Sequence, residues 1–139
     1  MDRWIFVFWK DYLVNATIYG VDRIDKPSRL EGVIGITYCR LDCTDKRSLD
    51  DKFKGIEFDI IIDDASHKLV QQKASFEILY PKLKSGGTYV IEDADVDNMN
   101  IFKAMNKGAE LYDMRELRKG NNRTGRLNNL VVYKKGMHG

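Results

Sequence analysis

Acidic side chains close four successive apolar segments of the chain. The segments are short and rich in β-branched and aromatic residues, as buried strands are. The acids that end them are Asp22, Asp42, Asp63 with Asp64, and Glu92 with Asp93. In open parallel sheets, ligands bind at the carboxyl ends of the strands. The sequence therefore predicts that these carboxylates form a binding edge, although each could instead cap the helix that follows it.

Two kinds of chemistry suit such an edge. A strand-end carboxylate can accept both hydroxyl groups of a ribose, and Asp22 fits that role. Asp64, Glu92 and Asp93 would repel one another unless a cation lay among them, and ligands that are all oxygens favour Mg²⁺ or Ca²⁺ over Zn²⁺. We expect His67 one turn into the helix after Asp64, beside the metal as a general base. The alternative for His67 is a surface histidine at a helix N-terminus.

Short apolar runs alternate with helical patterns along the chain. This order predicts an α/β fold with a largely parallel sheet. The predicted strands cover residues 16–22, 32–42, 58–64 and 88–93. The near-continuous isoleucine of the third strand is typical of a parallel strand covered on both faces.

Helices are expected between and after these strands. Ser66 is the predicted N-cap of a helix that carries an apolar stripe and ends in a turn at "SGG", residues 85–87. The stripe consists of Leu69, Phe76, Leu79 and Leu83. A short helix over 96–107 has a second stripe of Met99, Phe102 and Met105. Residues 109–115 and 127–135 predict a terminal antiparallel pair, joined by the polar loop "KGNNRTG".

The N-terminal segment "DRWIFVFWKDYLVNA" fits either a helix or a strand, and we favour the helix. One helical face then carries the apolar residues Ile5, Phe8, Trp9, Tyr12 and Leu13, while Phe6 and Val7 point elsewhere. The surplus apolar surface would need a partner, such as another subunit.

Composition bounds the function. A chain of 139 residues predicts a single domain, residues 1–139. The net charge of +2 is too balanced to indicate nucleic acid, and we interpret the basic cluster of the C-terminal third as a solvated face. "WIFVFW" is too short to span a membrane. Cys39 and Cys43 form neither a zinc pattern nor a disulfide framework, so we expect free thiols and a cytoplasmic protein.

The stretches "FDIIIDDASH" and "SGGTYVIED" resemble class I S-adenosylmethionine-dependent methyltransferases. More narrowly, they are similar to the metal-dependent macrolide sugar O-methyltransferases and the related cephalosporin hydroxylase group, which carry an "IDDGSH" strand end and a "GG-x-YVIED" strand. "WKDYLVNATIYGVD" and "ELYDMR…NNLVVYKK" also resemble this group, so the resemblance covers nearly the whole chain. It implies a Rossmann-like methyltransferase sheet.

The resemblance also implies roles for the acids. Asp64, Glu92 and Asp93 would bind Mg²⁺, and His67 would deprotonate a substrate hydroxyl. Three acids would lie on the side of S-adenosylmethionine: Asp22 on the ribose, Asp42 near the adenine, and Asp63. The expected function is O-methylation of a sugar or another small molecule. Ala65 stands where the group has glycine.

The resemblance further implies a first strand and a Gly-rich loop before the N-terminal helix, and no G-x-G-x-G stretch occurs here. That strand lies in the middle of the sheet, so its absence would leave unpaired backbone groups. The flanking strands could pair directly, "WIFVFW" could replace the strand, or another subunit could fill the gap. We therefore expect a homo-oligomer. The alternatives to an O-methyltransferase are a shortened, non-catalytic binding or assembly protein and a different reaction on S-adenosylmethionine between subunits.

Overall fold

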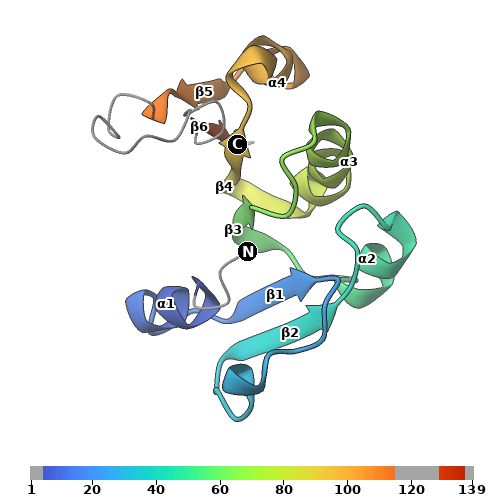
Figure 1. Ribbon diagram of the computed structural model, residues 1–139, viewed down its shortest axis with the longest axis vertical. Coiled ribbons are helices and arrows are strands. Elements are labelled where there is room, and N and C mark those ends of the chain that lie inside the picture. The colour runs from blue at the N-terminus through green and yellow to red at the C-terminus, as the bar shows by residue number, and fades with distance from the viewer. Residues whose placement is uncertain (1–4, 115–128, 137–139) are drawn as a thin grey trace. The chain divides into compact units, whose positions relative to one another are not determined.

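The computed structural model describes residues 5–114 and 129–136 (Figure 1). Contacts divide the chain into two compact units, residues 1–52 and 53–139, and we treat each unit by itself. The single domain expected from the sequence stays a prediction. The loop "KGNNRTG" and most of the basic cluster lie outside the described residues.

The first unit is built on a pair of parallel strands. Its elements are helix α1 (Ile5–Tyr12), strand β1 (Ile18–Asp22), the 3-10 turn η1 (Ser28–Leu30), strand β2 (Ile36–Arg40) and helix α2 (Lys46–Lys52). The register runs from Ile18 beside Ile36 to Asp22 beside Arg40, so both strands end at the same edge. The first two predicted strands and the N-terminal helix are confirmed.

Helix α1 meets its sheet through a residue that the predicted face leaves out. A Cβ atom on Gly20 of β1 would lie 3.0 Å from the ring of Phe6, and that ring is also in edge contact with Tyr38 of β2. The missing side chain of Gly20 is what lets the ring approach the strand. Phe8 and Tyr12 of the predicted face are 57% and 72% exposed. The surplus apolar surface of the helix is therefore on this face.

The second unit holds a mixed sheet. Its elements are β3 (Phe58–Asp63), α3 (Leu69–Leu79), η2 (Tyr80–Lys82), β4 (Leu83–Ala94), η3 (Val96–Asn98), α4 (Met99–Met105), β5 (Ala109–Tyr112) and β6 (Asn129–Lys134). The strand order is β3-β4-β6-β5, with β3 and β4 parallel and the other neighbours antiparallel. The predicted α/β class, the parallel strands and the terminal antiparallel pair are confirmed.

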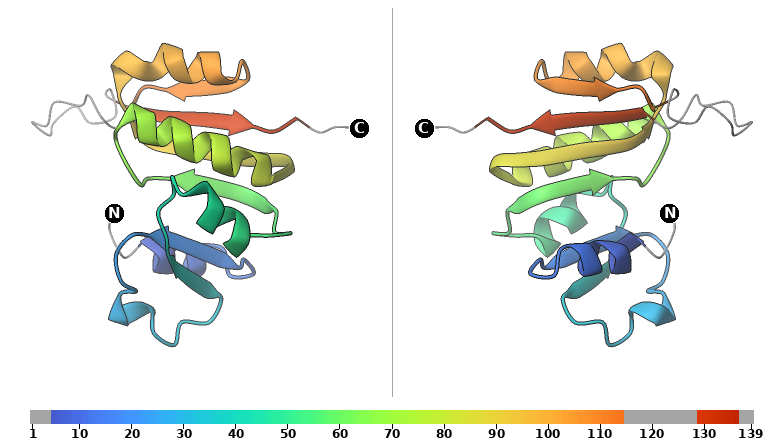
Figure 2. Two further views of the ribbon diagram at one scale, coloured as in Figure 1. Left: turned by 90° about the vertical axis from the view of Figure 1, so that its right-hand side faces the viewer. Right: turned by 90° about the vertical axis from the view of Figure 1, so that its left-hand side faces the viewer.

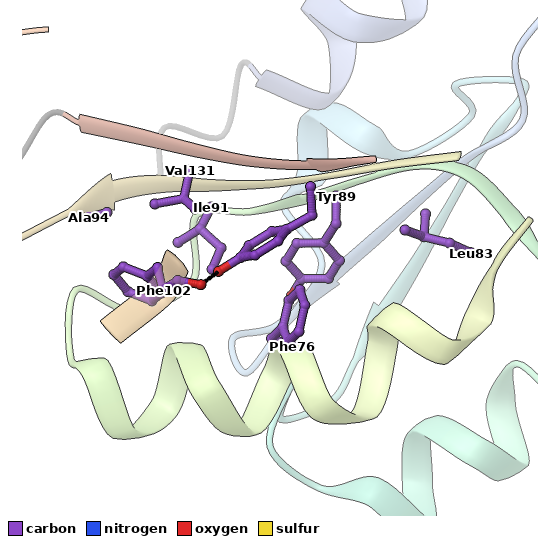
Figure 3. Close-up of a cluster of buried hydrophobic side chains, with 8 residues drawn as sticks. Phe76, Leu83, Tyr89, Ile91, Ala94, Phe102 and Val131 are labelled. Atoms are coloured by element: carbon purple, nitrogen blue, oxygen red, sulfur yellow. Dashed lines mark hydrogen bonds between the residues drawn. The ribbon is translucent and has the colours of Figure 1, made fainter. Parts of the chain in front are cut away.

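One face of this sheet carries the core (Figures 2 and 3). Tyr89 and Ile91 of β4 lie opposite Tyr133 and Val131 of β6, and alternate residues of a strand share a face. All four are 0% exposed. Helix α3 adds Phe76, and α4 adds Phe102 with the partly buried Met99 and Met105 against the same cluster. The predicted stripe of α4 is confirmed.

Three local predictions are wrong. "SGG" does not form a turn before β4 but lies within it, because Gly86 adopts a φ of 79° and Gly87 has its would-be Cβ 2.9 Å from the carbonyl oxygen of Lys84. The pairing with β3 is irregular here, so the glycines allow a bulge. Leu83 accordingly starts β4 rather than extending the helix. The N-cap of α3 is Lys68, and the hydroxyl of Ser66 accepts its N–H at 3.2 Å.

The absent central strand is not replaced by "WIFVFW", since residues 5–12 are helical. Direct pairing of the flanking strands is also wrong for the described residues, because β1-β2 and β3-β4-β6-β5 are separate sheets. Filling by another subunit stays a prediction. Within residues 5–114 and 129–136, no helix is long and apolar enough to cross a membrane.

The buried hydroxyl of Tyr133 offers a test of the core. It donates a hydrogen bond of 2.9 Å to the carbonyl oxygen of Phe102. We expect Tyr133→Phe to lower the free energy of unfolding by about 1–3 kcal/mol, because a buried carbonyl is left without its donor. Urea denaturation measures the change. Tyr112→Phe is the control, since Tyr112 is 45% exposed and bonds to Glu110 at the surface. Equal stabilities for the two variants would contradict this packing.

Candidate active site

Two of the predicted cofactor acids lie together at the strand ends of the first unit. Asp22 ends β1, and its Oδ1 accepts the N–H of Arg23 at 2.7 Å. Asp42 lies two residues beyond β2. The register places these strand ends side by side, and Arg23 reaches a carboxylate oxygen of Asp42 at 3.9 Å. The parallel pair therefore brings both acids to one edge, as predicted.

The carboxylate of Asp42 is already engaged locally. Its Oδ1 accepts the N–H of Thr44 at 2.8 Å and the hydroxyl of Thr44 at 2.7 Å. These two hydrogen bonds lower the pKa of Asp42, and Arg23 adds to the effect. Oδ2 faces Arg23 alone in these contacts, so one oxygen is left to accept a ligand.

The predicted metal acids come together in the second unit because β4 is irregular at its end. Neighbouring residues of a regular strand point to opposite faces. Here the pairing with β6 shifts between Ile91 and Ala94, and Asp93 adopts a φ of 51°. A bulge re-aims side chains, and a left-handed aspartate is an uncommon conformation that concentrates at functional sites. The bulge lets Glu92 and Asp93 both act on the same neighbour, Asp64.

The electrostatics of the three acids record this proximity. Burial raises the pKa of Asp64, and the charge of Asp93 raises it further. Burial likewise raises the pKa of Glu92, followed by the charges of Asp64 and Asp93. All three groups therefore feel one another's negative charge, which a cation would relieve.

The acids are not arranged as a finished metal centre. Among the residues that the structure describes, no group of three or more His, Cys, Asp or Glu side chains could hold a metal ion as it stands. The donor set is all oxygen and rich in charge, which suits Mg²⁺ or Ca²⁺, and the raised pKa values show mutual repulsion. The chemistry fits a divalent cation, while the side chains would have to converge on it. The metal site stays a prediction.

His67 lies next to this group. Its Nδ1 is 3.7 Å from Oδ2 of Asp93, and the two side chains are 50% and 36% exposed. The predicted position in the helix is wrong: α3 begins at Leu69, and Lys68 before it has extended backbone angles. His67 therefore lies in the loop between β3 and α3. There it is accessible to a ligand and beside an acid that can orient the imidazole.

Asp63 differs from the other acids because it is buried, with 6% exposure. Its carboxylate accepts the hydroxyl of Tyr89 at 3.0 Å and the N–H of Ala65 at 3.2 Å. Burial raises the pKa of Asp63, and hydrogen bonds from Ala65, Tyr89 and Ser75 partly offset the effect.

Sequence reasoning missed two polar residues on the buried face of α3. Gln72 and Ser75 are each 1% exposed. Gln72 donates to the carbonyl oxygen of Glu92 at 3.4 Å, and Ser75 bonds to Asp63. The signal was present in the spacing, because both residues fall on the helical face that Leu69 and Phe76 define. They were overlooked because the pattern was sought in apolar residues alone.

Comparisons with known proteins were made at the level of families, curated proteins and solved structures. No family model matches the chain. An 8-demethyl-8-α-L-rhamnosyl tetracenomycin-C 2'-O-methyltransferase of Streptomyces olivaceus is 38% identical over 96 residues, which cover 68% of this chain and 25% of the relative. A mycinamicin VI 2''-O-methyltransferase of Micromonospora griseorubida is 38% identical over 86 residues, which cover 61% of this chain and 21% of the relative.

The structural comparison agrees in kind. A MycE methyltransferase from the mycinamycin biosynthetic pathway, solved in complex with Mg and SAH, is 25% identical with a TM-score of 0.67. The match covers 93% of this chain and 39% of that one. An rRNA methylase from Streptococcus thermophilus, at 15% identity and a TM-score of 0.58, shares the fold alone.

The chain thus spans about a quarter of the length of the curated relatives it matches. The resemblance read from "IDDASH" and "VIED" is confirmed: the matching relatives are O-methyltransferases, and those named here carry sugar positions in their names. The predicted methyltransferase fold is confirmed as well. This chain is a homologue of sugar O-methyltransferases and has a methyltransferase fold.

Proposed function

We propose that this chain acts as part of an O-methyltransferase that uses S-adenosylmethionine and a divalent cation to methylate a hydroxyl of a sugar or another small molecule. One observation carries the proposal. Asp64, Glu92 and Asp93 converge at the bulged end of β4 with mutually unfavourable charges, and His67 lies 3.7 Å from Asp93. The homologues with sugar positions in their names and the MycE complex with Mg and SAH support the same assignment.

The residues of the second unit divide the chemistry. Asp64, Glu92 and Asp93 would hold the cation, with Mg²⁺ the favoured ion for an oxygen-only set. When bound, such a cation lowers the pKa of a coordinated hydroxyl and orients it. His67 accepts the proton of that hydroxyl at an imidazole nitrogen, and Asp93 beside Nδ1 stabilises the imidazolium that results.

The first unit supplies the cofactor contacts in this proposal. Asp22 accepts hydrogen bonds from the ribose hydroxyls of S-adenosylmethionine, and Asp42 lies near the adenine. The sulfonium of the cofactor provides an activated methyl group, so the protein must mainly align the acceptor oxygen with it. Self-association, which the sequence also predicts, stays a prediction that a mass from light scattering would check.

Cofactor binding is the first test. Calorimetry with S-adenosylmethionine should show binding, and Asp22→Ala should weaken it by about 10- to 100-fold, because hydrogen bonds to a charged group contribute about 1.5–3 kcal/mol. Asp25→Ala is the matched control, since Asp25 is an exposed acid of the same unit paired with Arg40 at 2.8 Å. No heat at millimolar cofactor would favour a non-catalytic binding protein instead.

Cation binding is the second test. We expect Asp64→Asn and Glu92→Gln each to weaken Mg²⁺ binding by at least the roughly 10- to 100-fold that loss of an outer-shell partner causes. Asp59→Asn is the control, because Asp59 lies on the same strand β3 but pairs with Lys84 at 2.9 Å and has a side chain 79% exposed. Equal titrations for Asp59→Asn and Asp64→Asn would show that the acids do not bind the ion.

The metal-free chain provides a third test, with the opposite sign. The raised pKa values of Asp64 and Glu92 mean that the stability they contribute is full below their unfolded pKa values and is lost as pH rises through the folded ones. In EDTA at pH 7, Asp64→Asn should therefore raise the melting temperature by about 2–4 °C, which corresponds to roughly 0.5 kcal/mol for groups partly screened by solvent. The gain should disappear near pH 4. A loss of stability at pH 7 would contradict the repulsion.

A further inference from the structure

A buried polar group adjoins the acids of the proposed metal site. Its members come from three elements: Asp63 from β3, Tyr89 from β4, and Gln72 and Ser75 from α3. None is more than 6% exposed. Burying polar groups costs free energy unless they are hydrogen-bonded, so their contacts identify what the arrangement holds in place.

The carboxylate of Asp63 fixes the main chain on both sides of Asp64. Its Oδ1 accepts the N–H of Ala65, two residues on, at 3.2 Å. That bond closes a tight turn around Asp64. Its Oδ2 accepts the hydroxyl of Tyr89 at 3.0 Å, and Ser75 adds a further bond. The turn that carries Asp64 is thereby attached to both β4 and α3.

Gln72 fixes the other strand end. Its side-chain N–H₂ donates to the main-chain oxygen of Glu92 at 3.4 Å. Glu92 sits where the register of β4 shifts, so its carbonyl lies outside regular pairing and is open to a side-chain donor. Gln72 thus ties α3 to the bulge from which Glu92 and Asp93 project.

We propose that Asp63 and Gln72 are positioning residues of the metal site: Asp63 orients Asp64, and Gln72 orients Glu92 and Asp93. This inference rests on the proposed function. It assigns Asp63 a different role from the cofactor contact expected from the sequence. A cofactor hydroxyl could reach this carboxylate only by displacing the buried bonds from Ala65 and Tyr89. A rigid second layer of this kind is what holds metal ligands within a productive geometry.

Three variants test the proposal through Mg²⁺ affinity. Asp63→Ala removes the acceptor for Ala65 and should weaken Mg²⁺ binding by about 10- to 100-fold. Asp63→Asn keeps an oxygen that can accept the same N–H, so it should restore an affinity near that of the wild type. Gln72→Leu removes the donor to Glu92 and should also weaken binding. It should remain folded, because it also removes a buried Oε1 that has no hydrogen-bond partner among the described residues.

A second measurement separates positioning from general damage to the fold. Amide exchange at Ala65 should become faster in Asp63→Ala and stay close to the wild-type rate in Asp63→Asn and in Gln72→Leu. Asp59→Ala, on the exposed part of the same strand, should change neither the exchange nor the affinity.

The outcomes are distinct. If the wild type does not bind Mg²⁺, the proposed function itself fails. If the wild type binds Mg²⁺ and all three variants bind it equally well, the positioning roles are wrong and the proposed function stands. If Asp63→Ala lowers the affinity for S-adenosylmethionine and leaves Mg²⁺ binding unchanged, Asp63 is a cofactor contact and the inference is overturned.

Discussion

Repulsion between carboxylates at the ends of two parallel strands is the constraint to which the second unit answers. Asp64, Glu92 and Asp93 lie close enough for their charges to raise the pKa values of Asp64 and Glu92. A sequence selected for stability alone would separate these groups or neutralise them. Their persistence beside His67 makes sense if a cation and a substrate complete the arrangement. Stability and function therefore pull in opposite directions at this edge.

The backbone of β4 accommodates that constraint at both ends of the strand. At its start, Gly86 and Gly87 allow the pairing with β3 to jump without a break in the sheet. At its end, the shift before Ala94 and the left-handed Asp93 turn two neighbouring carboxylates toward one region. Between these irregularities, Tyr89 and Ile91 keep regular alternation and anchor the strand in the core. The rigid middle of the strand is what lets its end carry strain.

Helix α3 links the core to the site through one continuous face. Phe76 packs against Tyr89 and Tyr133 with ring centroids 5.2 and 4.5 Å away. One turn earlier, Gln72 and Ser75 face the strand ends instead and bond to Glu92 and Asp63. A single helix thus meets apolar side chains over the sheet and polar groups at its edge. This explains why a helix with buried polar residues still packs as a core element.

The sequence by itself determined the α/β class, the parallel strands, the terminal antiparallel pair and the acids at the strand ends. These features follow from local patterns, because hydrophobic periodicity and strand-end residues lie within a few positions of one another. Tertiary structure alone decided the bulges of β4, the position of His67 in a loop, the burial of Asp63 and the inward face of Gln72. Each of these depends on a partner distant along the chain, such as Tyr89 for Asp63 or Glu92 for Gln72. A local pattern records the residue type, but only packing sets whether a carboxylate faces a ligand or a buried hydroxyl.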